Sequence, residues 1–199
     1  MTRHDPSYSG RETSMRRILT VGVLAVGLCL TPAGPVSAEE RTCRGTLGAV
    51  TVDNLRVPQG ASCTLNGTRV KGTVKVERSA TLLANQVSVI GNVQAENAAK
   101  VRVLDRSSVG GSVQVVQGGA ARVADSGIGG DILFDDNTRQ LSAVRNRVGG
   151  SLQAFQNTGG VSISNNRIDG NLQCKENRPP PTGGGNVVQG NKEDQCASL

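Results

Sequence analysis

The sequence has little aromatic or imidazole chemistry. Its 199 residues include no Trp, one His, one Tyr, two Phe and two Met. The only His (His4), the only Tyr (Tyr8) and both Met lie in the N-terminal segment 1–38, which we interpret below as a leader. The remaining chain therefore has no imidazole for a Ser-His-Asp or Cys-His centre, or for a His-ligated zinc ion. Only Phe134 and Phe155 are left to stack against sugars or bases. We expect no cofactor.

The excess of basic residues is small. Lys and Arg total 22 against 16 Asp and Glu, which gives a formal net charge of +6. A nucleic-acid-binding domain concentrates Lys and Arg on one face, usually among aromatic residues. The charge pattern instead predicts a solvated surface of mixed sign and no nucleic-acid partner.

The N-terminal segment has the pattern of a secretory signal peptide. Two arginines precede an apolar run over residues 18–30, and the Val-Ser-Ala sequence that ends at Ala38 is a small-residue cleavage site. The run is shorter than a transmembrane helix needs. We therefore expect a signal peptide over residues 1–38, cleaved after Ala38. The product would be secreted, extracellular or associated with the cell wall, with no membrane contact after removal of the leader.

Glycines recur at nearly constant spacing through most of the remaining chain, about every 20 residues. They are Gly72, Gly91, Gly111, Gly130, Gly150, Gly170 and Gly190. Each is followed by a small polar residue and, in most repeats, by an aliphatic, a polar and a further apolar or small residue. This period-two alternation predicts a short strand at the start of every repeat. A second alternating run and an apolar position before each glycine indicate two or three short strands per repeat.

Strands that recur about every 20 residues favour an all-β, single-domain parallel β-helix, or solenoid. Each strand would pair in parallel with its equivalent in the next coil, about 4.8 Å away. No stretch has a sustained helical period, and β-branched residues dominate the predicted strands. We expect about six coils of roughly 20 residues. The predicted organisation is an N-terminal cap and first coil over residues 39–71, repeats over 72–172, and a C-terminal coil and cap over 173–199.

Two asparagine columns follow the same period. One contains Asn137, Asn157 and Asn177, and the other contains Asn146, Asn166 and Asn186. Stacked Asn side chains hydrogen-bond along the axis of a coil and tolerate the left-handed backbone of its turns. We interpret both columns as structural ladders.

The glycine, polar, aliphatic repeat of residues 72–172, together with these ladders, resembles the right-handed parallel β-helix class that includes the pectate-lyase-like proteins. The same motif is similar to that of the bactofilins, which are polymer-forming β-helix proteins. The first resemblance implies a polysaccharide-active enzyme as one functional alternative. The second implies self-assembly as another.

Four cysteines follow the predicted leader: Cys43, Cys63, Cys174 and Cys196. An even number in a secreted chain favours disulfides, and four cysteines allow three pairings. Cys43 and Cys63, and likewise Cys174 and Cys196, are separated by about one coil, which would stack each pair at about 5 Å, within the Cα range of a disulfide. We predict that Cys43–Cys63 and Cys174–Cys196 each clamp an end coil. The Pro-rich and Gly-rich stretch over residues 179–185 predicts a loop or terminal cover.

A catalytic alternative would use Asp131, Asp135 and Asp136. Two carboxylates on opposite sides of a glycosidic bond can hydrolyse it, and carboxylates gathered in a turn can bind Ca²⁺. Sugar-cleaving β-helix proteins usually have extended loops that wall a cleft, and the constant spacing here leaves no room for such loops. A solvated acidic turn, with no catalytic residue and no metal, is the preferred interpretation.

An outward glutamine column is the first candidate binding surface. It contains Gln94, Gln114, Gln153 and Gln173. With their Thr, Asn and Ser neighbours they predict a flat, uncharged strip that would meet a glycan, a partner sheet or a second copy of the chain. The plainer alternative is a soluble sheet face on which the Gln side chains stack.

An arginine patch is the second candidate surface. It contains Arg145, Arg147 and Arg167. Like charges stacked on neighbouring coils repel, so the patch predicts an anionic partner such as a wall polymer. Arg102 and Arg122 also occupy equivalent positions in successive repeats, but Asp105 and Asp125 are expected to neutralise them across a turn.

Together these features predict a secreted, non-enzymatic β-solenoid that acts as a surface, structural or adhesion-type binding module at the bacterial envelope. The predicted partner is a cell-wall or extracellular glycan or another anionic polymer. The alternatives are a polysaccharide lyase or hydrolase and a self-assembling, bactofilin-like polymer.

Overall fold

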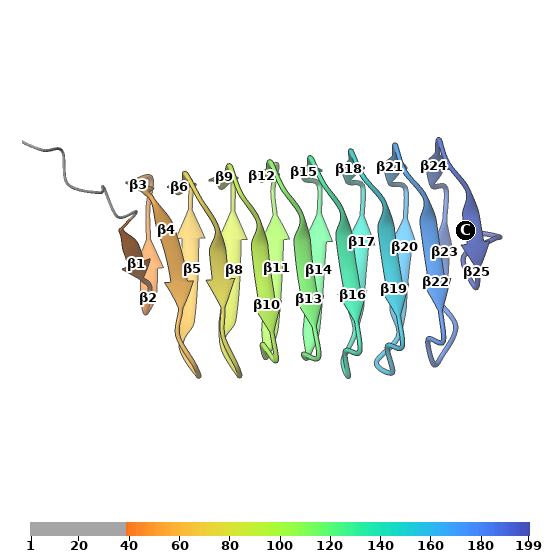
Figure 1. The fold of residues 1–199 in the computed structure, drawn as a ribbon, viewed down its shortest axis with the longest axis horizontal. Helices are drawn as coiled ribbons and strands as arrows, with labels where there is room; N and C mark the ends of the chain where they lie inside the picture. Colours follow the sequence, from red (N-terminus) through yellow and green to blue (C-terminus); the bar gives the residue numbers. More distant parts are fainter. Residues whose placement is uncertain (1–38) are drawn as a thin grey trace, which may run out of the picture. The chain divides into compact units, whose positions relative to one another are not determined.

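The computed structural model describes residues 39–199, so the predicted signal peptide lies outside the described residues. These residues form one compact body of 25 short strands (Figure 1). They contain no helix that is long and apolar enough to cross a membrane. Equivalent strands of successive turns pair in parallel, and the predicted all-β parallel solenoid is confirmed.

The strands belong to three sheets, here named A, B and C. Sheet A contains β1 (Glu40–Thr42), β4 (Asn54–Val57), β7 (Val74–Val76), β10 (Val93–Glu96), β13 (Val113–Val116), β16 (Ile132–Asp135), β19 (Leu152–Phe155), β22 (Leu172–Lys175) and β25 (Lys192–Asp194). Sheet B contains β2 (Gly45–Leu47), β5 (Ser62–Asn66), β8 (Thr81–Asn85), β11 (Lys100–Leu104), β14 (Ala120–Ala124), β17 (Leu141–Val144), β20 (Val161–Ser164) and β23 (Thr182–Gly184). Sheet C contains β3 (Thr51–Val52), β6 (Arg69–Val70), β9 (Ser88–Val89), β12 (Ser108–Val109), β15 (Gly127–Ile128), β18 (Arg147–Val148), β21 (Arg167–Ile168) and β24 (Val187–Val188).

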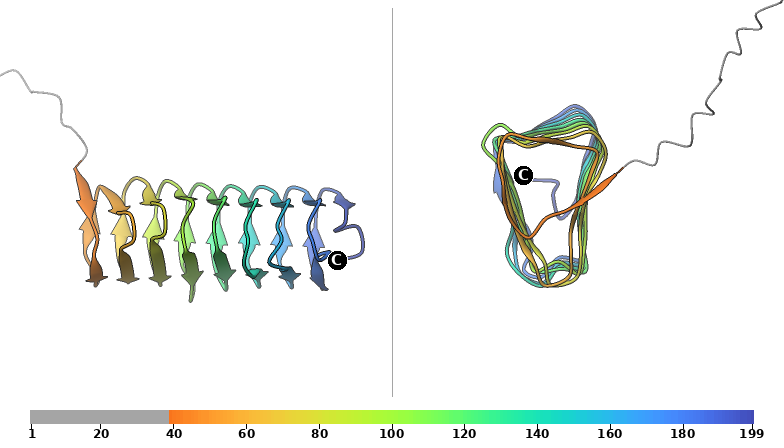
Figure 2. Two further views of the ribbon diagram at one scale, coloured as in Figure 1. Left: turned by 90° about the horizontal axis from the view of Figure 1, so that it is seen from below. Right: turned by 90° about the vertical axis from the view of Figure 1, so that its left-hand side faces the viewer.

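Each turn of the solenoid runs through one strand of each sheet, and the sheets form the sides of a three-sided cross-section (Figure 2). There are eight complete turns, and β25 begins a ninth. The glycine repeat indicates about six, because Glu39 and Asp53 occupy the glycine position in the first two turns. Residues 39–71 therefore form two turns, β1–β3 and β4–β6.

The corners between sheets absorb the small variation in the length of the turns. Strands β12 and β15 are one residue closer in sequence than the preceding pair, β11 and β14. The extra residue lies between β11 and β12, where Asp105 and Arg106 both have positive φ. Similarly, β14 and β17 are one residue further apart than β13 and β16, so an extra residue lies between β16 and β17. Register within each sheet continues undisturbed.

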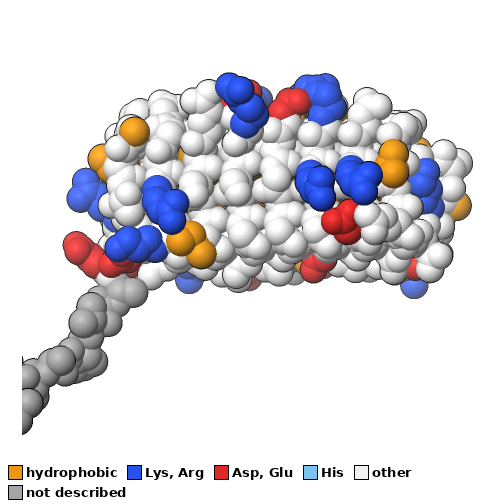
Figure 3. Space-filling model, turned by 90° about the horizontal axis from the view of Figure 1, so that it is seen from above, with side chains coloured by type: hydrophobic (Ala, Val, Ile, Leu, Met, Phe, Trp, Pro, Cys, Tyr) orange, Lys and Arg blue, Asp and Glu red, His pale blue; other side chains and the backbone are white. Residues whose placement is uncertain are grey.

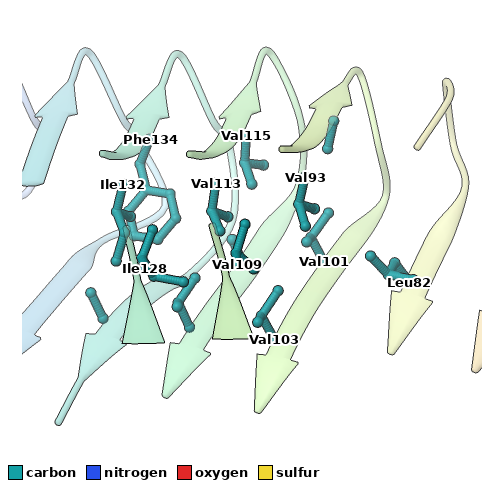
Figure 4. Packing of buried hydrophobic residues seen from close by; sticks show 14 of the residues in the cluster. Leu82, Val93, Val101, Val103, Val109, Val113, Val115, Ile128, Ile132 and Phe134 are labelled. Carbon is teal, nitrogen blue, oxygen red and sulfur yellow. The ribbon is translucent and has the colours of Figure 1, made fainter. Parts of the chain in front are cut away.

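Inward side chains form aliphatic columns that fill the solenoid. The labelled side chains of successive turns point toward one another in the interior (Figure 4). Phe134, which is fully buried, lies in one column between Val115 and Ala154. The small Ala154 compensates for the volume of the ring. Burial of each Val, Leu or Ile contributes about 1.5–3 kcal/mol, so these columns are the main source of stability.

The recurring glycines lie at the corner between sheets C and A, where adjacent turns leave no room for a Cβ atom. A Cβ on Gly150 would collide with Oδ1 of Asp131 in the preceding turn. The residue after each glycine donates its backbone N–H to that side-chain oxygen. Ser151 N donates to Asp131 Oδ1 (2.6 Å), and Asp131 N donates to Ser112 Oγ (2.9 Å). The small polar residues thus form a third ladder, which the asparagine pattern did not predict.

Both predicted asparagine ladders are confirmed and lie buried inside the other two corners. Asn157 Nδ2 donates to Asn177 Oδ1 (2.8 Å) and to the carbonyl of Phe134 (3.0 Å). Asn157 Oδ1 accepts from the backbone N and the Nδ2 of Asn137, both at 3.0 Å. Gln195 ends this ladder, because its Oε1 accepts from the backbone N (2.8 Å) and the Nδ2 (3.1 Å) of Asn177. The second ladder joins Asn146, Asn166 and Asn186 in the same way.

Both predicted disulfides are present, one near each end. Cys43 and Cys63 join the first two turns, with Cα atoms 5.7 Å apart. Cys174 of β22 joins Cys196, which follows β25, with Cα atoms 5.2 Å apart. Each bridge therefore ties a terminal segment to the turn beside it.

The C-terminal segment covers its end of the solenoid. After β25 the chain turns across the cross-section, and Leu199 is buried there (Figure 2). The predicted loop over residues 179–185 is wrong for Thr182–Gly184, which form β23 and pair with β20. Glycine permits this pairing, since a Cβ on Gly183 would collide with the carbonyl oxygen of Ile163.

Replacing Asn157 by Ala tests the ladder. The substitution removes four hydrogen bonds and leaves buried partners unsatisfied on both sides, so we expect a loss of about 3 kcal/mol in the free energy of unfolding. Urea denaturation measures it. The matched control is Asn66→Ala, an exposed Asn that accepts a single bond from Asn85, which should cost no more than about 0.5 kcal/mol. Equal losses from the two variants would contradict the structural role of the ladder.

The double substitution Cys174→Ala with Cys196→Ala tests the C-terminal clamp. A bridge that closes a loop of 22 residues contributes about 3 kcal/mol in the chain-entropy view. We expect faster amide hydrogen exchange in residues 192–199, with protection retained in the central turns. Unchanged exchange at the C-terminal end would show that the bridge is not what holds the cap.

Candidate functional site

The outward side chains form columns on three faces, one over each sheet. The hollows among them are open depressions on these faces, not a walled cleft. Within residues 39–199, no group of three or more His, Cys, Asp or Glu side chains is placed to hold a metal ion. The candidate sites are therefore surfaces.

The predicted glutamines lie in one outward column of sheet A. Strand register pairs Gln94 with Gln114 and Gln153 with Gln173. Leu133 separates the two pairs. Gln153 Nε2 donates to Gln173 Oε1 (2.8 Å), and Gln173 Nε2 donates to Glu193 Oε2 (2.6 Å). In the C-terminal half of the strip, the amides thus hydrogen-bond to one another and to Glu193 along the axis of the solenoid, whereas Gln94 is exposed.

The N-terminal half of the strip lines a depression of about 710 Å³. Gln94 and Gln114 line it together with Lys75 and Glu77. Arg56 Nη1 donates to Glu77 Oε1 (3.2 Å). This hydrogen bond is the main cause that holds the pKa of Glu77 below its ordinary value. Glu77 is therefore paired, whereas Lys75, Arg78 and Glu96, which also line the depression, belong to no ion pair among residues 39–199.

The predicted arginine patch divides into two parts. Arg147 and Arg167 stack in register over sheet C, and Arg167 Nε lies 3.9 Å from Asp169 Oδ1. Arg145 is engaged elsewhere: its Nε and Nη2 donate to the two carboxylate oxygens of Asp125 at 2.6 and 2.8 Å. This bidentate pair holds the pKa of Asp125 below its ordinary value. In Figure 3, which looks down on the solenoid, charged side chains form separate clusters on a mostly uncharged surface.

Gly127 leaves a hollow beside Arg147. It occupies the position of Arg147 in the preceding turn, and Ser108 occupies that position one turn earlier. Because glycine has no side chain, an open depression of about 510 Å³ forms there, also lined by Arg106 and Arg145. Three guanidinium groups thus border one notch, and a carboxylate, that of Asp125, balances one of them.

The three candidate carboxylates lie in different environments. Asp131 belongs to the ladder at the corner between sheets C and A. Asp135 lies at the other end of β16, four residues away, which is about 13 Å along an extended strand. Glycosidase carboxyls lie about 5–9.5 Å apart. Asp136 follows Asp135 in the corner with a φ of 52°. The structure therefore places Asp136 next to Asp135 and separates Asp131 from both.

Asp135 lies in an apolar stretch of the outer face of sheet A. Register places Val116 on one side of it and Phe155 on the other. Burial raises the pKa of Asp135, and the neighbouring charge of Asp136 raises it further. A raised pKa is a property of general acids, and it is also what an unpaired carboxylate acquires between apolar neighbours.

A cluster of cations over sheet B was not predicted as a site. Lys100 and Arg102 on β11 and Arg122 on β14 occupy outward positions. None of them belongs to an ion pair among residues 39–199. The stacking of Arg102 on Arg122 is visible in the sequence. Asp105 and Asp125 were expected to neutralise them. However, Asp125 pairs with Arg145, and Asp105 belongs to no ion pair among residues 39–199.

Replacing Asp135 by Asn tests the cost of its burial. The pKa of Asp135 is raised in the folded state above its ordinary value of 3.8. Between these two pKa values the folded state binds more protons than the unfolded state. The free energy of unfolding therefore falls as pH rises through this range. At pH 7 the variant should therefore melt about 1–2 °C higher than the parent protein. The difference should vanish below pH 3.8.

The control is Asp136→Asn, which keeps a residue type suited to positive φ and removes only the smaller cause of the shift. It should give a smaller gain in melting temperature. A destabilised Asp135→Asn variant at pH 7 would contradict this account and would mean that the carboxylate makes a favourable contact.

Comparisons with known proteins assign no family to this chain. No family model, no curated protein and no solved structure matches it. The functional argument therefore rests on the geometry of the described residues.

Proposed function

We propose that this protein is a secreted, non-enzymatic β-solenoid that acts as a surface or adhesion-type module at the bacterial envelope. It binds an extracellular or cell-wall polymer through its side faces. The observation that carries the proposal is the construction of those faces: outward side chains repeat at the coil spacing on a backbone fixed by three buried or half-buried polar ladders. A rigid face with repeating groups matches a polymer, which also repeats.

The two disulfides support an extracellular location. Disulfides persist in oxidising compartments, and both bridges here hold segments at the ends of the solenoid. The predicted signal peptide over residues 1–38 agrees with this location. An exported solenoid needs such clamps, because its end turns have a neighbour on one side only.

The absence of a walled cleft among residues 39–199 supports binding over catalysis. The depressions are partly open to solvent and lie over the outer faces and corners of the solenoid. The separation of Asp131 from Asp135 along β16 also exceeds that of paired glycosidase carboxyls. A lyase or hydrolase activity is the contrasting outcome of the experiment below.

Self-association is a second candidate that one observation favours. The outer edges of β1, β2 and β3 have no neighbouring strand among residues 39–199. Val50 beside them is 48% exposed, and Leu47 and Val52 are only partly buried. Open strand edges next to apolar side chains favour pairing with another chain. Sedimentation at increasing concentration separates this mode from polymer binding.

The test is an array of cell-wall and extracellular glycans probed with the oxidised protein, followed by product analysis of every polymer that it retains. We expect retention of at least one polymer and no release of fragments or unsaturated ends. Release of products would overturn the proposal in favour of an enzyme, and Asp131, Asp135 and Asp136 would be the first residues to replace. Retention of no polymer would leave self-association as the surviving function.

A further inference from the structure

We propose that the outer face of sheet B contains an anion-binding site, formed by Lys100, Arg102 and Arg122, that takes the acidic groups of an extended glycan. This inference rests on the proposed function and specifies its ligand class. It also moves the cationic site from the sheet C patch predicted from the sequence to a different face. Four observations carry it: register, missing counter-charges, a hollow and the composition of the surrounding face.

Strand register brings the cations together. Arg102 of β11 lies directly beside Arg122 of β14, and Lys100 lies beside Ala120. The two guanidinium groups therefore start from backbone positions about 4.8 Å apart. Lys100 is two residues before Arg102 on the same strand, so its side chain leaves the same face. Three positive charges thus gather within two turns.

Like charges that stand directly opposite on neighbouring strands repel and lower stability. Strand register produces such a cation pair at two other places in residues 39–199, and each has a nearby carboxylate. Arg56 beside Lys75 has Glu40 and Glu77. Arg147 beside Arg167 has Asp169. Each of these two pairs thus has at least one carboxylate partner within the chain.

The pair over sheet B has no such balance. Neither Arg102 nor Arg122 takes part in an ion pair among the described residues. Asp125 feels the charge of Arg122, but it gives both carboxylate oxygens to Arg145. Arg122 makes one neutral contact, from Nη1 to Ser142 Oγ at 3.3 Å. The positive charge is therefore left for a ligand to neutralise.

The cations border a hollow of about 490 Å³. Side chains shorten abruptly beyond them: Ala120 follows Lys100 across the sheet, and Ser142 follows Arg122. These small residues form the floor. Gln140 also lines the depression. An incoming group would therefore meet cationic side chains at one edge, with amide and hydroxyl groups at the other.

The surrounding face fits an acidic sugar polymer. The column that contains the arginines continues as hydroxyls toward the C-terminal end, at Ser142, Ser162 and Thr182. Hydroxyl and amide side chains bond sugar hydroxyls, and guanidinium groups bond carboxylate or sulfate in a bidentate manner. A nucleic acid is a poorer match, since bases need aromatic platforms and the two Phe rings belong to strands of sheet A.

The test measures binding of the oxidised protein to two acidic glycans, polygalacturonate and heparin, with fully methyl-esterified polygalacturonate as the neutral comparison. We expect binding to at least one acidic glycan, weakening as salt is added, and no binding to the ester. Arg102→Gln with Arg122→Gln should weaken binding about tenfold or more. Both side chains are exposed, and their removal relieves repulsion, so this variant should fold as well as the parent protein.

The matched control is Arg147→Gln with Arg167→Gln, which removes the same net charge from the stacked pair over sheet C. Its affinity should stay within about threefold of the parent protein. A further variant, Ala120→Gln, fills the floor of the hollow without changing charge and should also weaken binding.

Equal losses from the two double variants would overturn the site, because binding would then follow net charge and not position. A loss confined to the sheet C variant would return the function to the predicted patch. Binding of the ester alone would refute the acidic ligand but keep polymer binding. Binding to neither acidic glycan, while other polymers are retained, would refute this site and leave the broader proposal standing.

Discussion

The spacing between parallel strands of adjacent turns, about 4.8 Å, governs the rest of this structure. Backbone hydrogen bonds set it in all three sheets, so every residue meets its equivalent one turn away. An inward aliphatic residue meets an aliphatic residue, and a corner Asn such as Asn157 donates to the next Asn. Glycine at the corner between sheets C and A follows from the same spacing, since a Cβ on Gly150 would strike the turn before it. The same side-chain contact is therefore repeated from turn to turn along the axis of the solenoid.

The same constraint sorts the outer surface into balanced and unbalanced columns. Amides such as Gln153 and Gln173 satisfy each other when stacked, but cations do not. Each stacked cation pair therefore needs an acid, and the position of that acid depends on the corners. Asp125 lies in a corner with positive φ and reaches Arg145 in the following turn, which decides where positive charge is left over. The location of unbalanced charge is thus a property of corner geometry as much as of composition.

Much of the fold could be predicted because the period is explicit in the sequence. The glycine steps, the alternation and the Asn columns predict the solenoid, both ladders and both disulfides. The first two turns are not marked in this way because Glu39 and Asp53 replace the glycine. Strand β23 was not predicted because Pro and Gly are typical of loops. Asp131 has the residue type of a catalytic acid, although its place after a glycine is that of a ladder residue. The cations over sheet B can be identified in the sequence. Their lack of a carboxylate partner cannot, because it depends on Asp125 pairing with Arg145 across a corner, which residue spacing does not determine.

The corners have a consequence for how such a chain changes over generations. One extra residue between β11 and β12 is taken up by two left-handed positions, Asp105 and Arg106, and sheet C resumes its register at once. An insertion or deletion at a corner therefore leaves the strand register of the adjoining faces unchanged. Selection can alter the length of a turn without moving the outward residues of any sheet. Outward residues of each face can also be substituted one at a time, because the core and the ladders beneath them need not change.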